Sequence, residues 1–368
     1  MIAVIADCHC GNHARFGGAM ENGLNARARL TIASLQAAVK AAGAAGAATL
    51  FVAGDLFHSR RPEPALIAEV QRVFAEADPM LVVVVPGNHD MLDSSAAGGN
   101  TACAPLWDEA HVVREPEWHR CLNGKASDFV LSIPYESTVP MALHLARVLE
   151  GSLPKCEGKA VPRGRRILVT HVGVWDADSP KWTRGARDGI SAPMLFDLME
   201  KAGIGAAFVG NYHEHKIWER NGLTICQVGA LCPTGFGDSK PGKHGLMALG
   251  DASITKMVAI PGPRFEIVLE KHTEWGVPQD KNTYFVRQVG GVEATGAATE
   301  KLGGYEYVPA GDASGFGSSD EEEKQELFAP ADDPLAAVVK FAQEMELEDG
   351  ADRQAVVDLV SDLWKKGA

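Results

Sequence analysis

Histidine, aspartate and asparagine residues gather in five short segments of this chain, and side chains of these types bind divalent metals. The segments are IADCHCGNH (5–13), FVAGDLFH (51–58), VVVVPGNHD (82–90), ILVTHVGVW (167–175) and FVGNYHEHK (208–216). Their candidate metal ligands are Asp7, His9, Asp55, Asn88, His171, His213 and His215. Such a set suits Mn²⁺, Fe or Zn²⁺. Two ions roughly 3.5–4 Å apart stabilise both ends of a phosphodiester displacement by water, so the set predicts a two-metal phosphoesterase.

Most of these segments follow an apolar run of strand type. The runs are AVIA, ATLFVA, MLVVVV, RILVT and GAAFV. In an open α/β sheet the loops at the carboxyl ends of strands meet at one crevice, so ligands distant in sequence converge there. Asp55 is the lone ligand of its segment, and we expect it to bridge the two ions. Helical patterns over 23–46 and 63–78 alternate with the strands, which predicts a layered α/β fold.

Each motif alone also fits ordinary turn residues or structural histidines. In their order along the chain, however, D-x-H, GD, GNHD, H and H-x-H resemble the calcineurin-like metallophosphoesterase superfamily. The resemblance implies a sandwich of two central β-sheets flanked by helices. In place of the usual final GHxH the chain has GNYHEH, with Asn211 and Tyr212 before the histidine pair. This departure affects the expected geometry of the loop more than the identity of its ligands.

A finer resemblance lies beside Asp55. The stretch GDLFHSRRP, residues 54–62, is similar to the corresponding segment of SbcD and its eukaryotic relatives, the nucleases of double-strand-break repair. The resemblance implies a Mn²⁺-dependent double-strand exonuclease and single-strand endonuclease, a homodimer with an SbcC-like SMC-type ATPase partner. It also implies that His58 lies near bound DNA. Candidate phosphate contacts are Arg60, Arg61, Asn12, His13 and Arg15, although paired arginines are also typical of a solvated surface.

The resemblance divides the ligands between two subsites. One ion is expected on Asp7, His9, Asp55 and His215, and the other on Asp55, Asn88, His171 and His213. His89 then binds no metal, and we expect it to protonate the leaving 3′ oxygen or orient the phosphate, a role that contributes roughly 10²–10⁴-fold. The alternatives are a small-molecule phosphodiesterase or protein phosphatase, which a narrow crevice would favour, and a catalytically silent DNA-end scaffold.

The 368 residues are enough for more than one domain. We expect a metallophosphoesterase domain over 1–250. Short strands follow over 251–308, where the SbcD resemblance implies a small α+β cap that binds DNA; extra strands of one enlarged domain are the alternative. Residues 309–332 have the composition of an acidic flexible linker. Residues 333–368 predict two short amphipathic helices that need a partner surface, either the ATPase or the chain's own domain.

The formal net charge of −13 argues at first against DNA binding. Residues 309–368 hold 15 of the 48 acidic and 5 of the 35 basic residues, so 33 and 30 remain before them and that part is near neutral. The seven cysteines form no regular framework. No apolar stretch approaches the roughly 20 residues that cross a membrane, and the first ligands follow the N-terminus directly. We therefore expect a cytoplasmic, reducing setting.

Overall fold

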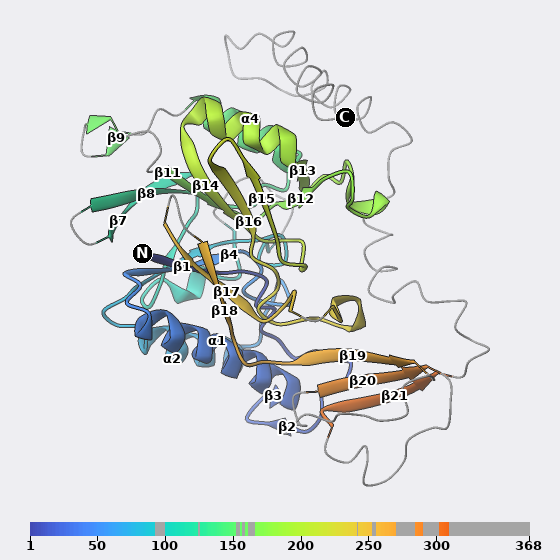
Figure 1. Ribbon diagram of the computed structural model, residues 1–368. Coiled ribbons are helices and arrows are strands. Elements are labelled where there is room, and N and C mark those ends of the chain that lie inside the picture. The colour runs from blue at the N-terminus through green and yellow to red at the C-terminus, as the bar shows by residue number, and fades with distance from the viewer. Residues whose placement is uncertain are drawn as a thin grey trace.

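Two large β-sheets with helices on their outer faces make up most of the protein (Figure 1). The computed structural model describes residues 1–92, 100–123, 126–151, 155–156, 159–160, 166–240, 242–251, 255–269, 284–289 and 302–308. The linker predicted over 309–332 and the helical pair predicted over 333–368 lie outside the described residues. The predicted α/β fold class is confirmed, because strands and helices alternate along the two sheets.

The first sheet has six strands in the order β18-β17-β1-β4-β5-β6. Their bounds are β1 Ile2–Ile5, β4 Thr49–Ala53, β5 Leu81–Val85, β6 His111–Val112, β17 Leu246–Gly250 and β18 Thr255–Ala259. β1, β4, β5 and β6 are parallel, and β17 pairs antiparallel with both β1 and β18. Because β18 continues this sheet, the sheet extends beyond residue 250, where the sequence placed the end of the first domain.

The second sheet also has six strands, in the order β15-β16-β14-β11-β8-β7. Their bounds are β7 Glu117–Asn123, β8 Ala126–Ile133, β11 Arg166–Thr170, β14 Ile204–Val209, β15 Lys216–Arg220 and β16 Leu223–Gln227. The four central strands are parallel, and β7 and β15 pair antiparallel at the two edges. Every residue of β11 and β14 is buried, as strands of a parallel sheet covered on both faces must be.

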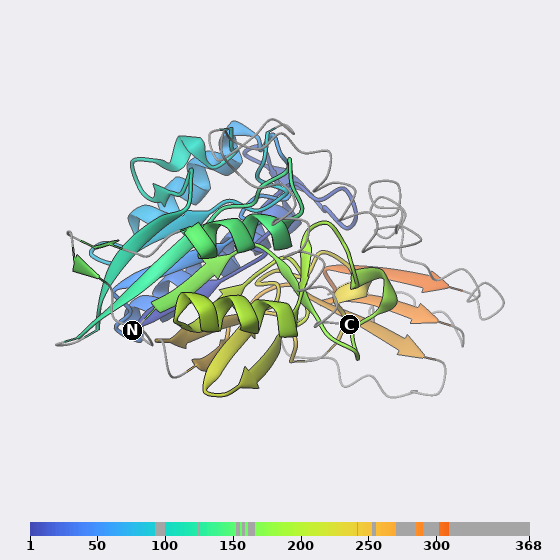
Figure 2. The ribbon, with the colours of Figure 1, turned by 90° about the horizontal axis from the view of Figure 1, so that it is seen from above.

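Three apolar clusters hold the layers together. The cluster between the sheets includes Phe51, Val83, Val130 and Phe208. α1 (Ala26–Ala44) and α2 (Pro64–Ala75) bury their apolar faces on the outer side of the first sheet, and α3 (Met141–Gly151) and α4 (Ala192–Ala202) on the outer side of the second. Figure 2 shows the resulting layers from above. Among the described helices, none combines the length and apolar composition that a bilayer crossing needs.

Short elements complete the fold, and two of them end in a residue that caps the start of a helix. They are β2 Met20–Glu21, β3 Leu24–Asn25, β9 Lys155–Cys156, β10 Lys159–Ala160, β12 Gly173–Trp175, β13 Gly189–Ser191, η1 Ala104–Leu106, η2 Lys181–Thr183 and η3 Phe236–Asp238. Asn25 caps α1 by accepting a hydrogen bond from Ala28 N, and Ser191 caps α4 by accepting one from Met194 N. Such caps satisfy backbone donors that a helix start leaves without a partner, which sets where each helix begins.

A separate three-stranded parallel sheet, here called the cap sheet, contains β19 (Arg264–Leu269), β20 (Tyr284–Val289) and β21 (Gly304–Val308). It lies to one side of the two large sheets in both ribbon views (Figures 1 and 2). Phe265 and Phe285 stack at 4.9 Å between ring centroids, and the guanidinium of Arg27 lies 4.9 Å from the Phe265 centroid. The cap sheet falls within the range where the sequence predicted a cap, and its role in DNA binding stays a prediction.

Candidate metal centre

The residues predicted to bind metal lie beyond the carboxyl ends of parallel strands in both large sheets. Those of the first sheet are Asp7, His9, Asp55 and Asn88, and those of the second are His171, His213 and His215. Backbone hydrogen bonds join the first two loops, since Asp7 N donates to Gly54 O at 3.0 Å and His9 N donates to Asp55 O at 3.0 Å. His171, which follows β11 of the second sheet, reaches Ala53 and Asp55 of the first, so the loops at the carboxyl ends of both sheets meet at one place, called the crevice below.

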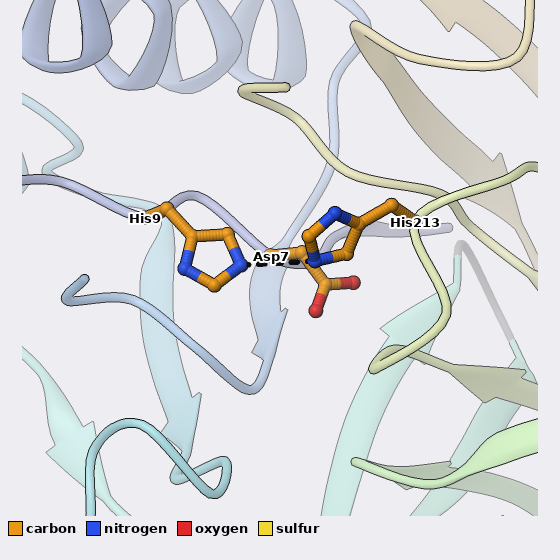
Figure 3. A group of neighbouring side chains, drawn as sticks. All are labelled: Asp7, His9 and His213. Atoms are coloured by element: carbon orange, nitrogen blue, oxygen red, sulfur yellow. Dashed lines mark hydrogen bonds between the residues drawn. The ribbon is translucent and has the colours of Figure 1, made fainter. Parts of the chain in front are cut away.

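One group of candidate ligands is formed by Asp7, His9 and His213 (Figure 3). Their ligand atoms lie within 4.8 Å of one another, and His9 Nε2 is 3.1 Å from His213 Nε2. His213 Nδ1 lies 2.9 Å from Asp238 Oδ2. A carboxylate only accepts, so Nδ1 carries the proton and the lone pair of Nε2 points into the crevice. An imidazole held in this way by a carboxylate is typical of a metal ligand.

A second group is formed by Asp7, Asp55 and His171, again within 4.8 Å. His171 Nδ1 donates to Ala53 O at 2.9 Å, which leaves a lone pair on Nε2. That nitrogen lies 2.9 Å from Asn88 Oδ1 and 3.3 Å from Asp55 Oδ1. When His171 is neutral, its Nε2, Asn88 Oδ1 and Asp55 Oδ1 are all hydrogen-bond acceptors. Acceptors approach one another this closely only around a shared proton or a cation.

The buried ionisable side chains of the crevice shift one another's pKa values. Burial alone would lower the pKa of His171, but Asp55 and then Asp7 raise it to about 10, because a proton fills the place between the acceptors. Burial raises and His171 lowers the pKa of Asp55, which ends below its usual range. Burial, then His213, lowers the pKa of His9 well below its usual value. Asp55 is therefore ionised and His9 neutral, which are the forms that bind metal, whereas burial raises the pKa of Asp7 and His171 holds a proton that a metal would displace.

Asp55 reaches both groups of candidate ligands. Its Oδ1 lies 3.3 Å from His171 Nε2 and its Oδ2 lies 3.9 Å from His9 Nε2. The side chain is only 3% exposed, so these two imidazoles and the neighbouring backbone supply most of its surroundings. This is the position that a bridging ligand needs, and the bridging role stays a prediction.

The last loop differs from the division of ligands that the resemblance implied. His213 lies with Asp7 and His9, although it was expected to share an ion with Asn88 and His171. The structure places His213 beside Asp7 and His9, and the division of the ligands between two ions stays a prediction. Two histidines at i and i+2 cannot be distinguished from sequence when the course of the turn before them is unknown.

Asn211 sets the course of this turn. Its backbone φ is 85°, and its N–H donates to both carboxylate oxygens of Asp7 at 3.1 Å. Its side-chain Nδ2 donates to Asp188 O at 3.0 Å, so the amide is directed to the loop before β13. His215 Nδ1 donates to Gln227 O at 2.8 Å, and among the described residues His215 belongs to neither ligand group.

His89 lies in the crevice without belonging to either ligand group. Its N–H donates to Asp55 Oδ1 at 2.9 Å, and its Nδ1 donates to His58 O at 3.1 Å. Its ring centroid lies 5.1 Å from that of His9. With Nδ1 held by a carbonyl, Nε2 is the atom that can take up or release a proton.

The sequence analysis missed Asp90, which organises the loops after β4 and β5. Its carboxylate is fully buried and accepts from Gly87 N at 2.9 Å, Phe57 N at 3.0 Å and Leu56 N at 3.2 Å. The final letter of GNHD was the available signal. Asp238 was also missed, and no pattern in its segment marks it as the partner of His213.

Backbone geometry at the ligands is unusual. Asp7, His9 and Asp55 have φ values of 50°, 44° and 51°, in the left-handed region that side chains other than glycine rarely adopt. Such conformations concentrate at functional sites because the surrounding structure holds them. Close approach also requires Gly54, where a Cβ would lie 2.0 Å from His171 Nδ1, and Gly87, where one would lie 2.3 Å from Asp55 Oδ1.

Two of the residues predicted to contact DNA lie against the crevice. The ring of His58 is 4.0 Å from that of His13 and is stacked at 6.1 Å on that of His89. His13 Nε2 lies 2.9 Å from His9 O, so the neighbouring rings of His13, His58 and His89 are linked to the first ligand loop. Burial, then His89 and Arg27, lowers the pKa of His58 to about 4, so its ring is neutral near pH 7.

The other four predicted contacts differ in their surroundings. Asn12 makes hydrogen bonds within the protein, since its Oδ1 accepts from Asn25 N at 2.8 Å and its Nδ2 donates to Gly23 O at 3.0 Å. Arg15 pairs with Glu306 of the cap sheet. Arg60 and Arg61 are exposed on the loop after β4, where a phosphate can reach them.

A scan against family models matches residues 1–216 to the calcineurin-like phosphoesterase family. The match covers more than half of the 368 residues, and the chain belongs to this family. The resemblance to the superfamily drawn from the motifs is thereby confirmed. Members are metal-dependent phosphoester hydrolases, so the chain is an enzyme of this class that uses divalent metal.

Several solved structures are similar in shape. TT1561 of Thermus thermophilus is 14% identical, with a TM-score of 0.42 over 70% of this chain and 97% of that one. GAP50 of Plasmodium, described as the anchor in the inner membrane complex, is 12% identical, with a TM-score of 0.37 over 70% and 84%. A putative 5′-nucleotidase from Staphylococcus aureus is 12% identical, with a TM-score of 0.41 over 70% and 52%. A search of curated proteins gives no match.

Asp90 provides a test of how the ligand loops are held. Asp90→Ala would leave three buried backbone N–H groups without an acceptor, at about 1–3 kcal/mol each, so we expect unfolding to become easier by at least about 3 kcal/mol. Denaturant unfolding of the metal-free protein measures this change. Asp90→Asn keeps an acceptor oxygen and should lose less. Equal stability of Asp90→Ala and the wild type would show that these hydrogen bonds contribute nothing.

His213 and His215 form a matched pair that tests the geometry of the last loop. We expect His213→Ala to weaken Mn²⁺ binding about 10-fold or more, because its Nε2 faces His9, and His215→Ala to leave binding nearly unchanged. Isothermal titration of each variant with Mn²⁺ gives the two affinities. A greater loss in His215→Ala would restore the division of ligands that the sequence resemblance implied.

Proposed function

We propose that this protein is a two-metal DNA nuclease that hydrolyses phosphodiester bonds at DNA ends, as the nuclease subunit of an SbcCD-like complex. The observation that carries the proposal is the pair of ligand groups that share Asp7. Asp55 belongs to one group and lies 3.9 Å from His9 of the other, and His89 lies beside both groups and belongs to neither. The stretch 54–62, which is similar to the SbcD segment, supports DNA as the substrate.

The residues present would hold two divalent ions, most simply Mn²⁺. Asp7, His9, His213 and Asp55 would hold one, and Asp55, His171 and Asn88 the other. When bound, a pair of such ions neutralises charge on the phosphate oxygens and activates water. The protein supplies orientation, because Asp238 and the backbone oxygen of Ala53 fix the tautomers of His213 and His171.

His89 is the proposed proton donor. Its backbone N–H donates to Asp55 and its Nδ1 donates to His58 O. These two hydrogen bonds restrict rotation of the ring and keep Nε2 directed to the crevice. A proton on Nε2 would neutralise the 3′ oxygen as the phosphorus–oxygen bond breaks. His58, stacked on this ring, would then contact the DNA strand near the bond that is cut.

The substrate is tested by comparing two phosphodiesters. Purified protein with Mn²⁺ is incubated with labelled duplex DNA and, separately, with bis-p-nitrophenyl phosphate. We propose that DNA is cleaved with the higher kcat/KM, since the exposed Arg60 and Arg61 bind a polyanion better than a small diester. Turnover of the small diester alone would instead support a small-molecule phosphodiesterase, and no turnover of either a silent scaffold.

His89→Ala should lower DNA cleavage by about 10²–10⁴-fold and leave metal content unchanged, because the residue acts as an acid and not as a ligand. Elemental analysis and single-turnover cleavage measure the two quantities. His144→Ala, in α3 on the outer face of the second sheet, is the matched control and should retain both. A loss of metal in His89→Ala would identify the side chain as a ligand.

The proposed ATPase partner would bind residues 333–368. Deletion of this segment should leave Mn²⁺-dependent cleavage of short DNA nearly unchanged, since every candidate ligand precedes residue 216, and should abolish co-purification with an SbcC-like ATPase. The measurement compares full-length and truncated protein in pull-downs with that ATPase. Equal binding would exclude the segment as the docking element, and unfolding on truncation would assign it to the enzyme's own core.

A further inference from the structure

A second cluster of metal-binding side chains lies away from the crevice, where the two large sheets both end. It is formed by His111 of β6 and by Glu117 and His119 of β7. β6 is the edge strand of the first sheet and β7 the edge strand of the second. Both ribbon views place β7 on the side of the sandwich opposite the cap sheet (Figures 1 and 2).

The three side chains converge from two different strands. Glu117 and His119 are two residues apart on β7, so they lie on the same face of that strand. This face is the inner one, because the ring of His119 lies 5.8 Å from that of Phe51 in β4 and Cys121 belongs to the cluster between the sheets. Trp118 lies between them in the strand and points to the opposite face, where it packs against the apolar cluster formed with α3 and α4.

Distances within this cluster are short. His111 Nε2 lies 2.7 Å from Glu117 Oε1, and the rings of His111 and His119 are 5.3 Å apart at 77°. One ligand atom from each of the three residues lies within 4.8 Å of the others. His119 Nε2 is buried and has no hydrogen-bond partner among the described residues. A buried polar atom left in this state requires an explanation, and a bound ion is one of the recognised ones.

We propose that His111, Glu117 and His119 bind a divalent transition metal, best matched by Zn²⁺, that joins the edges of the two sheets. Two imidazoles and one carboxylate are a zinc-binding set, and water can complete the tetrahedron. The side chains of His111 and Glu117 are 46% and 34% exposed, so they can move inward to the ligand distances of about 2.0–2.2 Å that zinc requires. The site would be structural, because its residues belong to neither ligand group of the crevice.

The electrostatics of His119 agree with this assignment. Burial lowers its pKa, Glu117 acts in the opposite direction, and His111 lowers it further, so the ring is neutral near pH 7 and has a lone pair for a metal. The simpler interpretation of the cluster is a hydrogen bond between His111 and Glu117 at the surface. That interpretation leaves Nε2 of His119 unexplained.

The experiment compares zinc binding by the full-length wild type, Glu117→Gln and the control Glu115→Gln, whose exposed carboxylate lies two residues away and outside the cluster. After equilibration with Zn²⁺ and removal of free metal, elemental analysis should give about one zinc per chain fewer for Glu117→Gln than for the other two proteins. Circular dichroism of the metal-free proteins checks that the variant is folded.

Two further measurements decide the outcome independently of the crevice. Zn²⁺ should raise the melting temperature of Glu115→Gln more than that of Glu117→Gln, because only Glu115→Gln retains all three ligands of the proposed zinc site. His119→Gln should behave as Glu117→Gln does. Phosphodiester cleavage with Mn²⁺ should be equal in all of these proteins, so failure of the proposed function would not affect the result. Equal zinc content and equal melting shifts in Glu117→Gln and its control would overturn the proposal.

Discussion

The contact between Asp55 and His171 joins the carboxyl ends of β4 and β11, and so the two sheets, at the candidate metal centre. Asp55 follows β4 in the first sheet and His171 follows β11 in the second, and their side chains meet at 3.3 Å. His171 also donates to Ala53 O, the last residue of β4, so one imidazole is bound to the first sheet through both of its nitrogens. The apolar cluster between the sheets fixes their spacing, and Gly54 allows the imidazole to approach.

This contact explains why the crevice requires a cation. Two buried carboxylates close together destabilise the folded state unless positive charge is nearby, and the desolvation that burial imposes exceeds what one neutral histidine returns. When a proton on His171 supplies the charge, its pKa rises to about 10. A divalent metal supplies more charge and displaces that proton, so metal affinity should rise with pH through the neutral range. The same residues that strain the metal-free site thus provide the binding energy for metal.

The sequence predicted the fold class and which side chains gather in the crevice, because strand ends and ligand types can be read directly. Asp7, His9, Asp55 and His171 come together as the strand-and-loop pattern required. The pattern could not show which of the two alternating histidines lies beside Asp7 and His9, since the course of the loop depends on the left-handed turn at Asn211. Asp238 also could not be predicted as the partner of His213, because the two residues are 25 positions apart, with β15 and β16 between them, and their contact depends on tertiary packing.

Arg27 shows how the cap sheet is related to the crevice. Its side chain is only 2% exposed, and it donates to the carbonyl oxygens of Arg15 and Thr234 while lying against the rings of Phe265 and Phe285. A buried guanidinium is tolerated when carbonyl oxygens and aromatic faces replace water. Arg15 in turn pairs with Glu306 of β21.

The loop that contains Arg15 also contains His13, whose ring lies against His58 at the crevice. One end of this loop is therefore set by the first ligand segment, through His9 O, and the other by the cap sheet. Because Arg27 is at the start of α1, which packs on the first sheet, the loop cannot shift without disturbing that sheet as well. The position of the histidines beside the metal centre is thus fixed jointly by the first sheet and the cap sheet, and not by the ligand loops alone.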